Sequence, residues 1–213
     1  MQIYNYGYFG QAVYDELVNQ SGEKTTVPSL IQIELNQRME TWFNPNEKVH
    51  VLISDYPLVN KAKEMENRVF DTGGVLIPIM IDYPYLTIGP VVQNGTEGCF
   101  HCFIDRLRQH DRNAHLQKEL TEYYENNQSV RHRSSFYPTD SILVAHFLIN
   151  LLKGKIENNL GKVRRLNVYN RTSYYVDVIG VHGCKRCGMK VDEKERSFAE
   201  LWKAFGKKEL INQ

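Results

Sequence analysis

All four cysteines of the chain fall in two short pairs, Cys99 with Cys102 and Cys184 with Cys187. Each pair has the Cys-x-x-Cys spacing and is flanked by glycine, which lets the backbone wrap closely around two sulfurs. Two thiolates spaced in this way can reach one tetrahedral ion, and a second pair completes a four-sulfur shell. Because such a shell leaves no position open for water or substrate, the spacing predicts one structural zinc ion that joins mid-chain to the far end.

Other uses of these cysteines have to be weighed. One Cys-x-x-Cys pair can be a redox dithiol of the thioredoxin type, but two pairs with no other cysteine favour a metal. Structural disulfides need an exporting context, and residues 1–10 lack a basic region followed by an apolar core. His101 and His182 lie close enough in sequence to replace a sulfur. With four cysteines present, we expect them to be ordinary loop histidines.

Length and composition describe a soluble globular protein. The 213 residues include 42% apolar and 24% charged side chains, which favours a single domain over residues 1–213. Within it we expect a Rossmann-like part (1–98) and a zinc-stapled helical and hairpin part (99–213). A formal net charge of +1 gives no electrostatic case for nucleic acid or an acidic membrane as partner. The apolar runs 75–81 and 142–152 are too short to span a bilayer. We therefore expect a cytoplasmic, reducing location.

Between the first expected strand and helix the chain reads Asn-Tyr-Gly-Tyr-Phe-Gly. This is the glycine-rich dinucleotide turn with Asn5 in place of the first glycine and with Gly7 and Gly10 kept. Asparagine tolerates the left-handed backbone region, so the turn can still form. Tyr8 and Phe9 are bulky for a loop that phosphate must approach. We interpret the turn as architecture rather than a working nucleotide site.

The rest of the chain alternates between strand and helix patterns. The expected elements are strands 2–6, 30–35, 50–54, 75–82 and 85–92, helices 10–20, 37–43, 57–72, 103–124 and one opening at Pro138, then a hairpin (162–169 with 173–181) and a tail helix (197–210). This order predicts an α/β fold with a Rossmann-like, mostly parallel sheet, helices on its faces and a C-terminal hairpin.

Several residues could serve a site but have a plainer interpretation. Glu34 lies about where a ribose-binding acid would fall, and we read it as a strand-end charge. The basic cluster 131–133 could hold a phosphate or an acidic peptide, although a solvated loop is the expected state. The helix after Pro138 is expected to bury Ile142, Ala145, His146, Ile149 and Leu152, which makes His146 a core histidine. No nucleophile arrangement stands out, so no catalytic residue is predicted.

One family resemblance rests on motifs around the first cysteine pair. Ile88-Gly89-Pro90 runs into Gly95, the Cys99 pair, and a helix bearing Asp105 and Arg106. With the Rossmann opening, the hairpin and the second cysteine pair, this order resembles the ThiF-like superfamily related to ubiquitin-activating enzymes. Residues 86–106 are similar to the ThiF-like subunits of azoline-forming peptide cyclodehydratases, including the microcin and thiopeptide scaffold proteins.

The resemblance implies a role in ribosomal peptide modification. Subunits of that family bind a precursor peptide and present its cysteines, serines or threonines to a YcaO-type partner, which uses ATP to close thiazole- or oxazole-type rings. The four cysteines map onto the family's structural zinc ligands. A flavin dehydrogenase and a second copy of the chain are further candidate partners.

Two departures from the family pattern narrow the expected function. The altered turn at Asn5 and the sequence 36–40 offer no triphosphate clamp, so we do not expect adenylation by this chain. The sequence opens directly at the expected Rossmann strand, so we expect no N-terminal winged-helix domain of the kind that grips the leader peptide in many cyclodehydratase subunits, and we expect another surface or a partner to bind the leader. The favoured function is a non-catalytic scaffold or precursor-binding subunit; the alternatives are a ThiF-type adenylating enzyme and a zinc-stabilised α/β binding domain of unrelated role.

Overall fold

A single mixed sheet organises the computed structural model, which describes residues 1–21, 28–34, 37–109, 111–127 and 136–187. Its strands follow the order β2-β1-β3-β4-β5-β7-β8, and β6 pairs with β4 beside this path. The strands are β1 (Gln2–Tyr6), β2 (Ser29–Gln32), β3 (Val49–Ser54), β4 (Val75–Asp82), β5 (Tyr85–Ile88), β6 (Val92–Gln93), β7 (Lys162–Asn167) and β8 (Ser173–Asp177).

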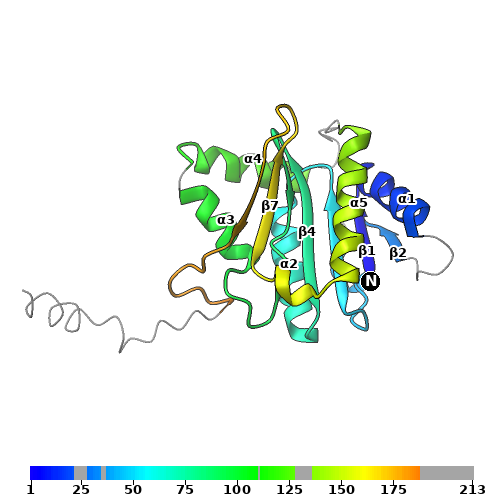
Figure 1. Cartoon of the computed structure of the whole chain (residues 1–213). Coiled ribbons are helices and arrows are strands. Elements are labelled where there is room, and N and C mark those ends of the chain that lie inside the picture. Colours follow the sequence, from blue (N-terminus) through cyan, green and yellow to red (C-terminus); the bar gives the residue numbers. More distant parts are fainter. Residues whose placement is uncertain (22–27, 35–36, 110, 128–135, 188–213) are drawn as a thin grey trace, which may run out of the picture.

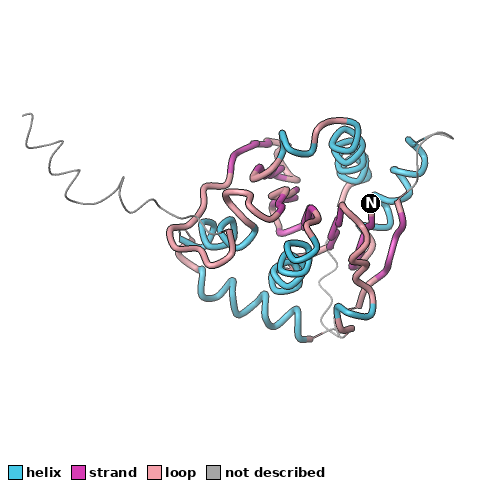
Figure 2. The backbone as a smooth tube through the Cα atoms, turned by 90° about the horizontal axis from the view of Figure 1, so that it is seen from below, coloured by secondary structure: helices cyan, strands magenta, loops and turns pink. Residues whose placement is uncertain are grey.

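Helices cover both faces of this sheet (Figures 1 and 2). They are α1 (Phe9–Ser21), α2 (Val59–Thr72), α3 (Phe100–Gln109), α4 (Ala114–Asn126) and α5 (Pro138–Lys153), with 3-10 turns η1 (Met39–Thr41) and η2 (Ile156–Asn159). The helix predicted over 103–124 is thus two helices, α3 and α4. The structure confirms the predicted end of α2, because Gly73 adopts the left-handed conformation (φ 71°) and its N–H bonds back to the carbonyl of Phe70.

The N-terminal half of the sheet is parallel. Strands β2, β1, β3 and β4 pair in parallel, and the strand order reverses direction between β1 and β3. In an open α/β sheet of this kind the crevice at such a reversal, outside the carboxyl ends of the strands, is the usual ligand site. The turn after β1 and the residue after β3 therefore meet where a Rossmann-like domain holds its ligand.

The C-terminal half of the sheet is antiparallel. Strands β5, β7 and β8 each pair antiparallel with the preceding strand in the sheet, as β6 does with β4. The sheet is therefore mixed rather than mostly parallel. Only two residues, Tyr83 and Pro84, connect β4 to β5, and a parallel crossover needs a dozen or more.

Two apolar layers result from the alternation of side chains along the strands. On one face, Tyr4 and Leu52 pack against α2 and α3; on the other, Ile3 and Val51 pack against α1 and α5. The register pairs Tyr4 with Leu52 and Ile3 with Val51, so paired residues share a face. The sheet thereby fixes α3 and the cysteine turns on one face only.

The buried side of α5 differs from the prediction. Among the residues expected there, Ala145 is buried, but Ile142, Leu152 and His146 are exposed, so His146 is no core histidine. The side chains that α5 buries are Asp140, Ser141, Val144, Ala145, Leu148 and Leu151. The sequence of α5 places apolar residues on nearly every side of the helix, so a 3.6-residue periodicity did not identify which side is buried.

Some predictions fall outside the part of the chain that the structure describes. The basic cluster 131–133 and the tail helix 197–210 are among them. Within the described ranges, no helix is both long enough and apolar enough to cross a membrane.

Candidate functional site

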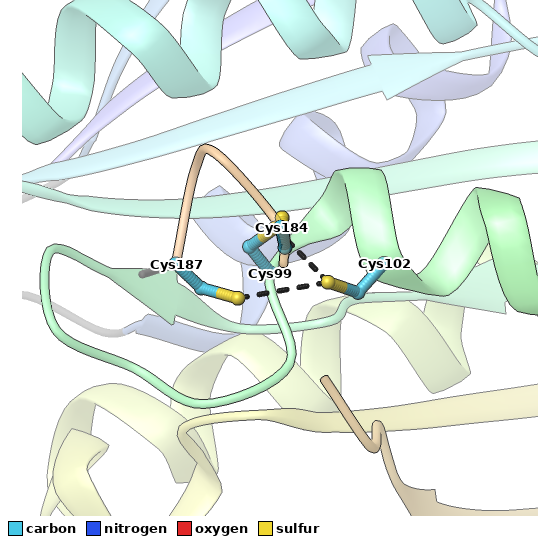
Figure 3. Close-up of side chains that lie close together, drawn as sticks. All are labelled: Cys99, Cys102, Cys184 and Cys187. Atoms are coloured by element: carbon cyan, nitrogen blue, oxygen red, sulfur yellow. Dashed lines mark hydrogen bonds between the residues drawn. The ribbon is translucent and has the colours of Figure 1, made fainter. Parts of the chain in front are cut away.

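The four cysteines that are far apart in sequence form one cluster (Figure 3). Their Sγ atoms all lie within 4.8 Å of one another. The separations are 3.7 Å for Cys99–Cys102, 3.8 Å for Cys99–Cys184 and 3.6 Å for Cys102–Cys187. Disulfide sulfurs lie about 2.05 Å apart, so these are free thiols placed together.

Two segments that are far apart in the sequence hold the cluster, one at the start of α3 and one after β8. Cys99 directly precedes α3 and Cys102 lies in its first turn, while Cys184 and Cys187 follow β8. Gly98 has φ +79°, and a Cβ there would collide with the carbonyl oxygen of Val178. Glycine at this position thus lets the chain that leads to the second pair lie directly against the first.

Backbone groups also point at the sulfurs. The N–H of Val181 donates to Cys102 Sγ over 3.2 Å, and the N–H of Arg186 donates to Cys184 Sγ over 3.4 Å. Such donors stabilise a thiolate more than a thiol. The cluster is therefore prepared for negative charge on sulfur.

Burial controls how easily the thiols ionise. It raises the pKa of Cys99 far above the ordinary value, with the negative charge of Glu66 acting in the same direction, and it raises the pKa of Cys102 to about 11. Burial also opposes ionisation of Cys187, but N–H groups of Cys99 and Gly98 and the neighbouring thiols hold its pKa below the ordinary value. Cys99 and Cys102 would thus keep their protons until a cation displaces them.

The cluster geometry fits a tetrahedral metal ion. A zinc ion with Zn–S bonds of about 2.3 Å places its four sulfurs about 3.8 Å apart. The three measured separations, 3.6 to 3.8 Å, match this spacing. The four cysteines are therefore compatible with a metal site, and a soft four-sulfur donor set suits zinc.

The glycine-rich turn is closed by a carboxylate of the same chain. Asp55, directly after β3, accepts the N–H of Tyr8 at Oδ2 over 2.8 Å and the N–H of Phe9 at Oδ1 over 2.7 Å. A Cβ at Gly7 (φ +98°) would collide with the Asp55 carboxylate. The carboxylate thus takes the backbone donors at the start of α1 that bind phosphate in a nucleotide site.

Asn5 and Gly10 complete this turn. The amide nitrogen of Asn5 donates to the carbonyl of Gly7 over 2.9 Å and to Gln32 Oε1 over 2.6 Å. A Cβ at Gly10 would collide with Asn5 Oδ1. Asn5 therefore ties the turn to β2, and the structure places the predicted turn residues Asn5, Gly7 and Gly10 close together.

A groove runs along α3 on the antiparallel half of the sheet. A cavity of about 270 Å³ lies between α3, α4 and strands β4, β5 and β7, with Phe100, Phe103 and Ile104 among its apolar lining and Asp82 and Arg165 among its polar lining. We call it the α3 groove. Phe103, Leu107 and Arg165 also line an adjoining cavity of about 390 Å³ beside β8.

Arg165 is one of the polar residues that line the α3 groove. Its guanidinium lies 4.1 Å from the centre of the Tyr85 ring, and its buried Nε has no hydrogen-bond partner among the described residues. Of the two residues that the family motif places on α3, Asp105 is exposed, whereas Arg106 Nη2 donates to the carbonyl of Gly180 over 3.2 Å. Arg106 thus braces the chain leading to the second cysteine pair.

Two residues at these sites were missed from the sequence, Asp55 and Glu66. Glu66 lies four residues after Ala62 and three before Val69, so helical spacing placed a charge on the apolar side of α2. That was the available signal for Glu66. Glu34, considered as a ribose-binding acid, is exposed, and its N–H bonds to Gln37 Oε1.

No known family and no curated protein matches the sequence, but the fold is similar to that of several solved structures. The structure is similar to the heterocyclase TruD, with a TM-score of 0.58, 14% identity, and coverage of 88% of this chain and 27% of that chain. It is also similar to a chain of the E. coli microcin synthetase McbBCD complex, with a TM-score of 0.60, 13% identity, and coverage of 85% and 66%. A third similar structure is E. coli MccB, determined together with MccA, with a TM-score of 0.58, 14% identity, and coverage of 88% of this chain and 66% of that chain.

This chain spans about a quarter of the TruD chain and just under two thirds of the other two. At 13–14% identity these similarities establish the fold.

Proposed function

We propose that this chain is a non-catalytic scaffold or precursor-binding subunit of a peptide cyclodehydratase complex, and that its four cysteines bind one structural zinc ion. In this role it presents the cysteines, serines or threonines of a precursor peptide to an ATP-using YcaO-type partner, in the cytoplasm. The similarity of its fold to a heterocyclase and to a microcin synthetase component supports a role in a peptide cyclodehydratase complex. The closed turn at Asp55 supports the non-catalytic role.

The bonds from Tyr8 and Phe9 to Asp55 are the observation that carries this proposal. An adenylating enzyme of Rossmann type needs the donors at the start of α1 for nucleotide phosphate. Here a fixed internal anion already occupies them, and a second anion would meet its negative charge. The four-sulfur cluster offers no substitute site, because four thiolates complete the coordination of a tetrahedral ion.

We further propose that the precursor peptide occupies the α3 groove. An apolar floor with a few convergent polar groups is typical of ligand sites, and the groove combines an apolar lining with Asp82 and Arg165. Leu107 on α3 is 37% exposed at the groove wall. These features can hold an extended peptide beside the strands.

The test combines purified chain, a candidate precursor peptide and a YcaO-type protein from the same genome. We expect direct binding of the precursor or partner, no ATP consumption by the chain alone, and ATP consumption once the YcaO-type protein is added. Pyrophosphate exchange by the purified chain alone would identify an adenylating enzyme instead. If the chain shows neither binding nor ATP turnover, it is a zinc-stabilised domain of unrelated role.

A matched pair of variants tests the α3 groove. Leu107→Asp should weaken precursor binding at least tenfold. Leu152→Asp is the control, because Leu152 is 42% exposed on α5, which covers the opposite face of the sheet. Equal binding by both variants would remove the groove from the proposal without affecting the scaffold role.

A further inference from the structure

A carboxylate is buried beside the cysteine cluster. Glu66, on α2, has no exposed surface and lies on the apolar side of that helix between Ala62 and Val69. Burying an ionised carboxylate is strongly unfavourable unless partners hydrogen-bond to it. The partners of Glu66 therefore indicate what the charge does.

These partners come from inside both Cys-x-x-Cys turns. Phe100 donates its N–H to Glu66 Oε1 over 2.6 Å, and His101 Nδ1 lies 2.6 Å from Glu66 Oε2. Phe100 and His101 are the two residues between Cys99 and Cys102. From the other turn, Arg186 Nε lies 3.9 Å from Glu66 Oε2.

Each contact restrains a different part of the cluster. Because Phe100 is the first residue of α3, the carboxylate also satisfies a free donor at the N-terminus of the helix that carries Cys102. The guanidinium of Arg186 lies 4.9 Å from the centre of the Phe70 ring, and its buried Nε and Nη2 have no hydrogen-bond partner among the described residues. Glu66 is thus the anion that faces Arg186 from α2.

We infer that Glu66 is a positioning residue for the metal site: through Phe100, His101 and Arg186 it holds both cysteine turns in register, so that the four sulfurs are assembled before an ion enters. This inference rests on the proposed metal site. The contacts of Glu66 form a tether that holds the two cysteine turns together without the metal. The ion therefore binds four sulfurs that are already largely in place.

Glu66 itself is a poorer ligand than the fourth cysteine. A ligand atom of Glu66, Cys99 Sγ and a ring nitrogen of His101 lie within 4.8 Å of one another, so a mixed site is geometrically conceivable. Both carboxylate oxygens, however, already face donors at 2.6 Å, and a metal bond would displace them. The four-sulfur set requires no such loss.

One effect of Glu66 acts against metal binding. Its negative charge raises the pKa of Cys99 and so opposes formation of that thiolate. The tether therefore strengthens metal binding only if positioning outweighs this repulsion. Loss of outer residues that orient ligands typically costs 10–100-fold in metal affinity, which sets the expected scale.

The matched control for Glu66 is Asp140. Asp140 is 1% exposed at the N-terminus of α5, accepts the N–H of Tyr137 over 2.9 Å and pairs with Arg171. Both residues are thus buried carboxylates that cap a helix and face an arginine, but only Glu66 contacts the cysteine turns. Substitution of either by leucine removes a buried charge, and only one substitution should change the metal site.

The experiment measures zinc affinity by competition with a chromogenic chelator, at a temperature where circular dichroism shows every variant folded. Glu66→Leu should bind zinc about 10–100-fold more weakly than the wild type. Asp140→Leu should bind within about twofold of it. Glu66→Gln should fall between, because its amide oxygen can still accept the N–H of Phe100. The cobalt(II) absorption of Glu66→Leu should also lose tetrahedral intensity.

Unchanged or tighter zinc binding by Glu66→Leu would overturn the inference, as would an equal loss in Asp140→Leu. If Glu66→Leu does not fold, Arg186→Gln decides the matter: its side chain is 23% exposed, and its loss releases only the second turn. Affinity at least severalfold below wild type supports the tether, and wild-type affinity refutes it. Absence of zinc binding by the wild-type chain would instead refute the proposed metal site.

Discussion

The carboxylate of Asp55, at the end of β3, lies 2.7 Å from the backbone nitrogen of Phe9 at the start of α1. Removing it in Asp55→Ala leaves the N–H groups of Tyr8 and Phe9 without their acceptor. We expect a loss of about 1–3 kcal/mol in the free energy of unfolding, the usual cost of an unsatisfied buried donor. Urea denaturation monitored by circular dichroism measures it.

The same variant should acquire a response to inorganic phosphate. With the Asp55 carboxylate removed, an anion can reach the N-terminus of α1, so phosphate should raise the Tm of Asp55→Ala more than that of the wild type. Chloride at matched ionic strength is the control for general salt effects. Equal phosphate responses would show that the carboxylate does not fill an anion position.

Removal of a single sulfur should disrupt the cysteine cluster. Cys102 lies 3.7 Å from Cys99 and 3.6 Å from Cys187, so Cys102→Ser breaks the four-sulfur shell at a shared corner. We expect zinc content to fall from one ion per chain and the Tm to fall with it, since structural zinc binding is folding free energy. Inductively coupled plasma mass spectrometry and thermal melts measure the two quantities.

A chelator separates loss of metal from loss of packing. Treatment of the wild type should reproduce the lowered Tm, and treatment of Cys102→Ser should have no further effect. A wild-type melting temperature in the variant, with one zinc ion per chain, would contradict the assignment.

Local patterns predicted most of the elements and the cysteine cluster. The Cys-x-x-Cys spacing sets how two sulfurs can converge, so the grouping of Cys99 with Cys184 followed from residue type and spacing alone. The antiparallel half was not predicted, because strand periodicity says nothing about pairing direction. The two-residue connection between β4 and β5 carried that information, since no parallel crossover is so short.

The roles of Asp55 and Glu66 could not be read from local sequence. Each acts on backbone donors more than thirty positions away in the chain, as the Asp55–Phe9 and Glu66–Phe100 bonds show. Tertiary packing decides such pairs. The buried stripe of α5 is a related case, because its many apolar residues leave the face to be chosen by contact with α1 and the sheet.

Close approach of two chain segments makes Gly98 sensitive to a single methyl group. Gly98→Ala adds a Cβ that meets the carbonyl of Val178 and forces a non-glycine residue to φ +79°. Gly95→Ala is the matched control, because Gly95 has φ +87° and no atom of the described residues lies within 4 Å of the added Cβ. Gly95→Ala should cost only the backbone strain, about 1–2 kcal/mol.

Gly98→Ala should cost more than this and should also lower zinc content, because the segment leading to Cys184 must move. Urea denaturation and metal analysis of both variants provide the comparison. Equal stabilities would mean that the Val178 segment yields without strain.

Stability should fall on mild acidification because of His50. This residue has no exposed surface, its Nε2 lies 2.9 Å from the carbonyl oxygen of Glu47, and its Nδ1 lies 3.2 Å from the Tyr4 hydroxyl. Burial lowers the pKa of His50 below its ordinary 6.5, although the Glu47 carbonyl and carboxylate act in the opposite direction. Below about pH 6.5 the unfolded chain therefore binds a proton that the folded chain does not, so this contribution to stability is complete above that pH and is lost as pH falls.

Urea denaturation between pH 7.5 and 5.5 measures the effect as a difference between variants, which removes the contributions of other groups. His50→Gln should be less stable than the wild type at pH 7.5 but should lose less stability on acidification. The slopes of the free energy of unfolding against pH should differ between the two proteins by at most about 1.4 kcal/mol per pH unit. His115→Gln is the control, because the His115 side chain is 86% exposed. Parallel pH profiles for His50→Gln and the wild type would show that His50 takes up its proton equally well in the folded chain.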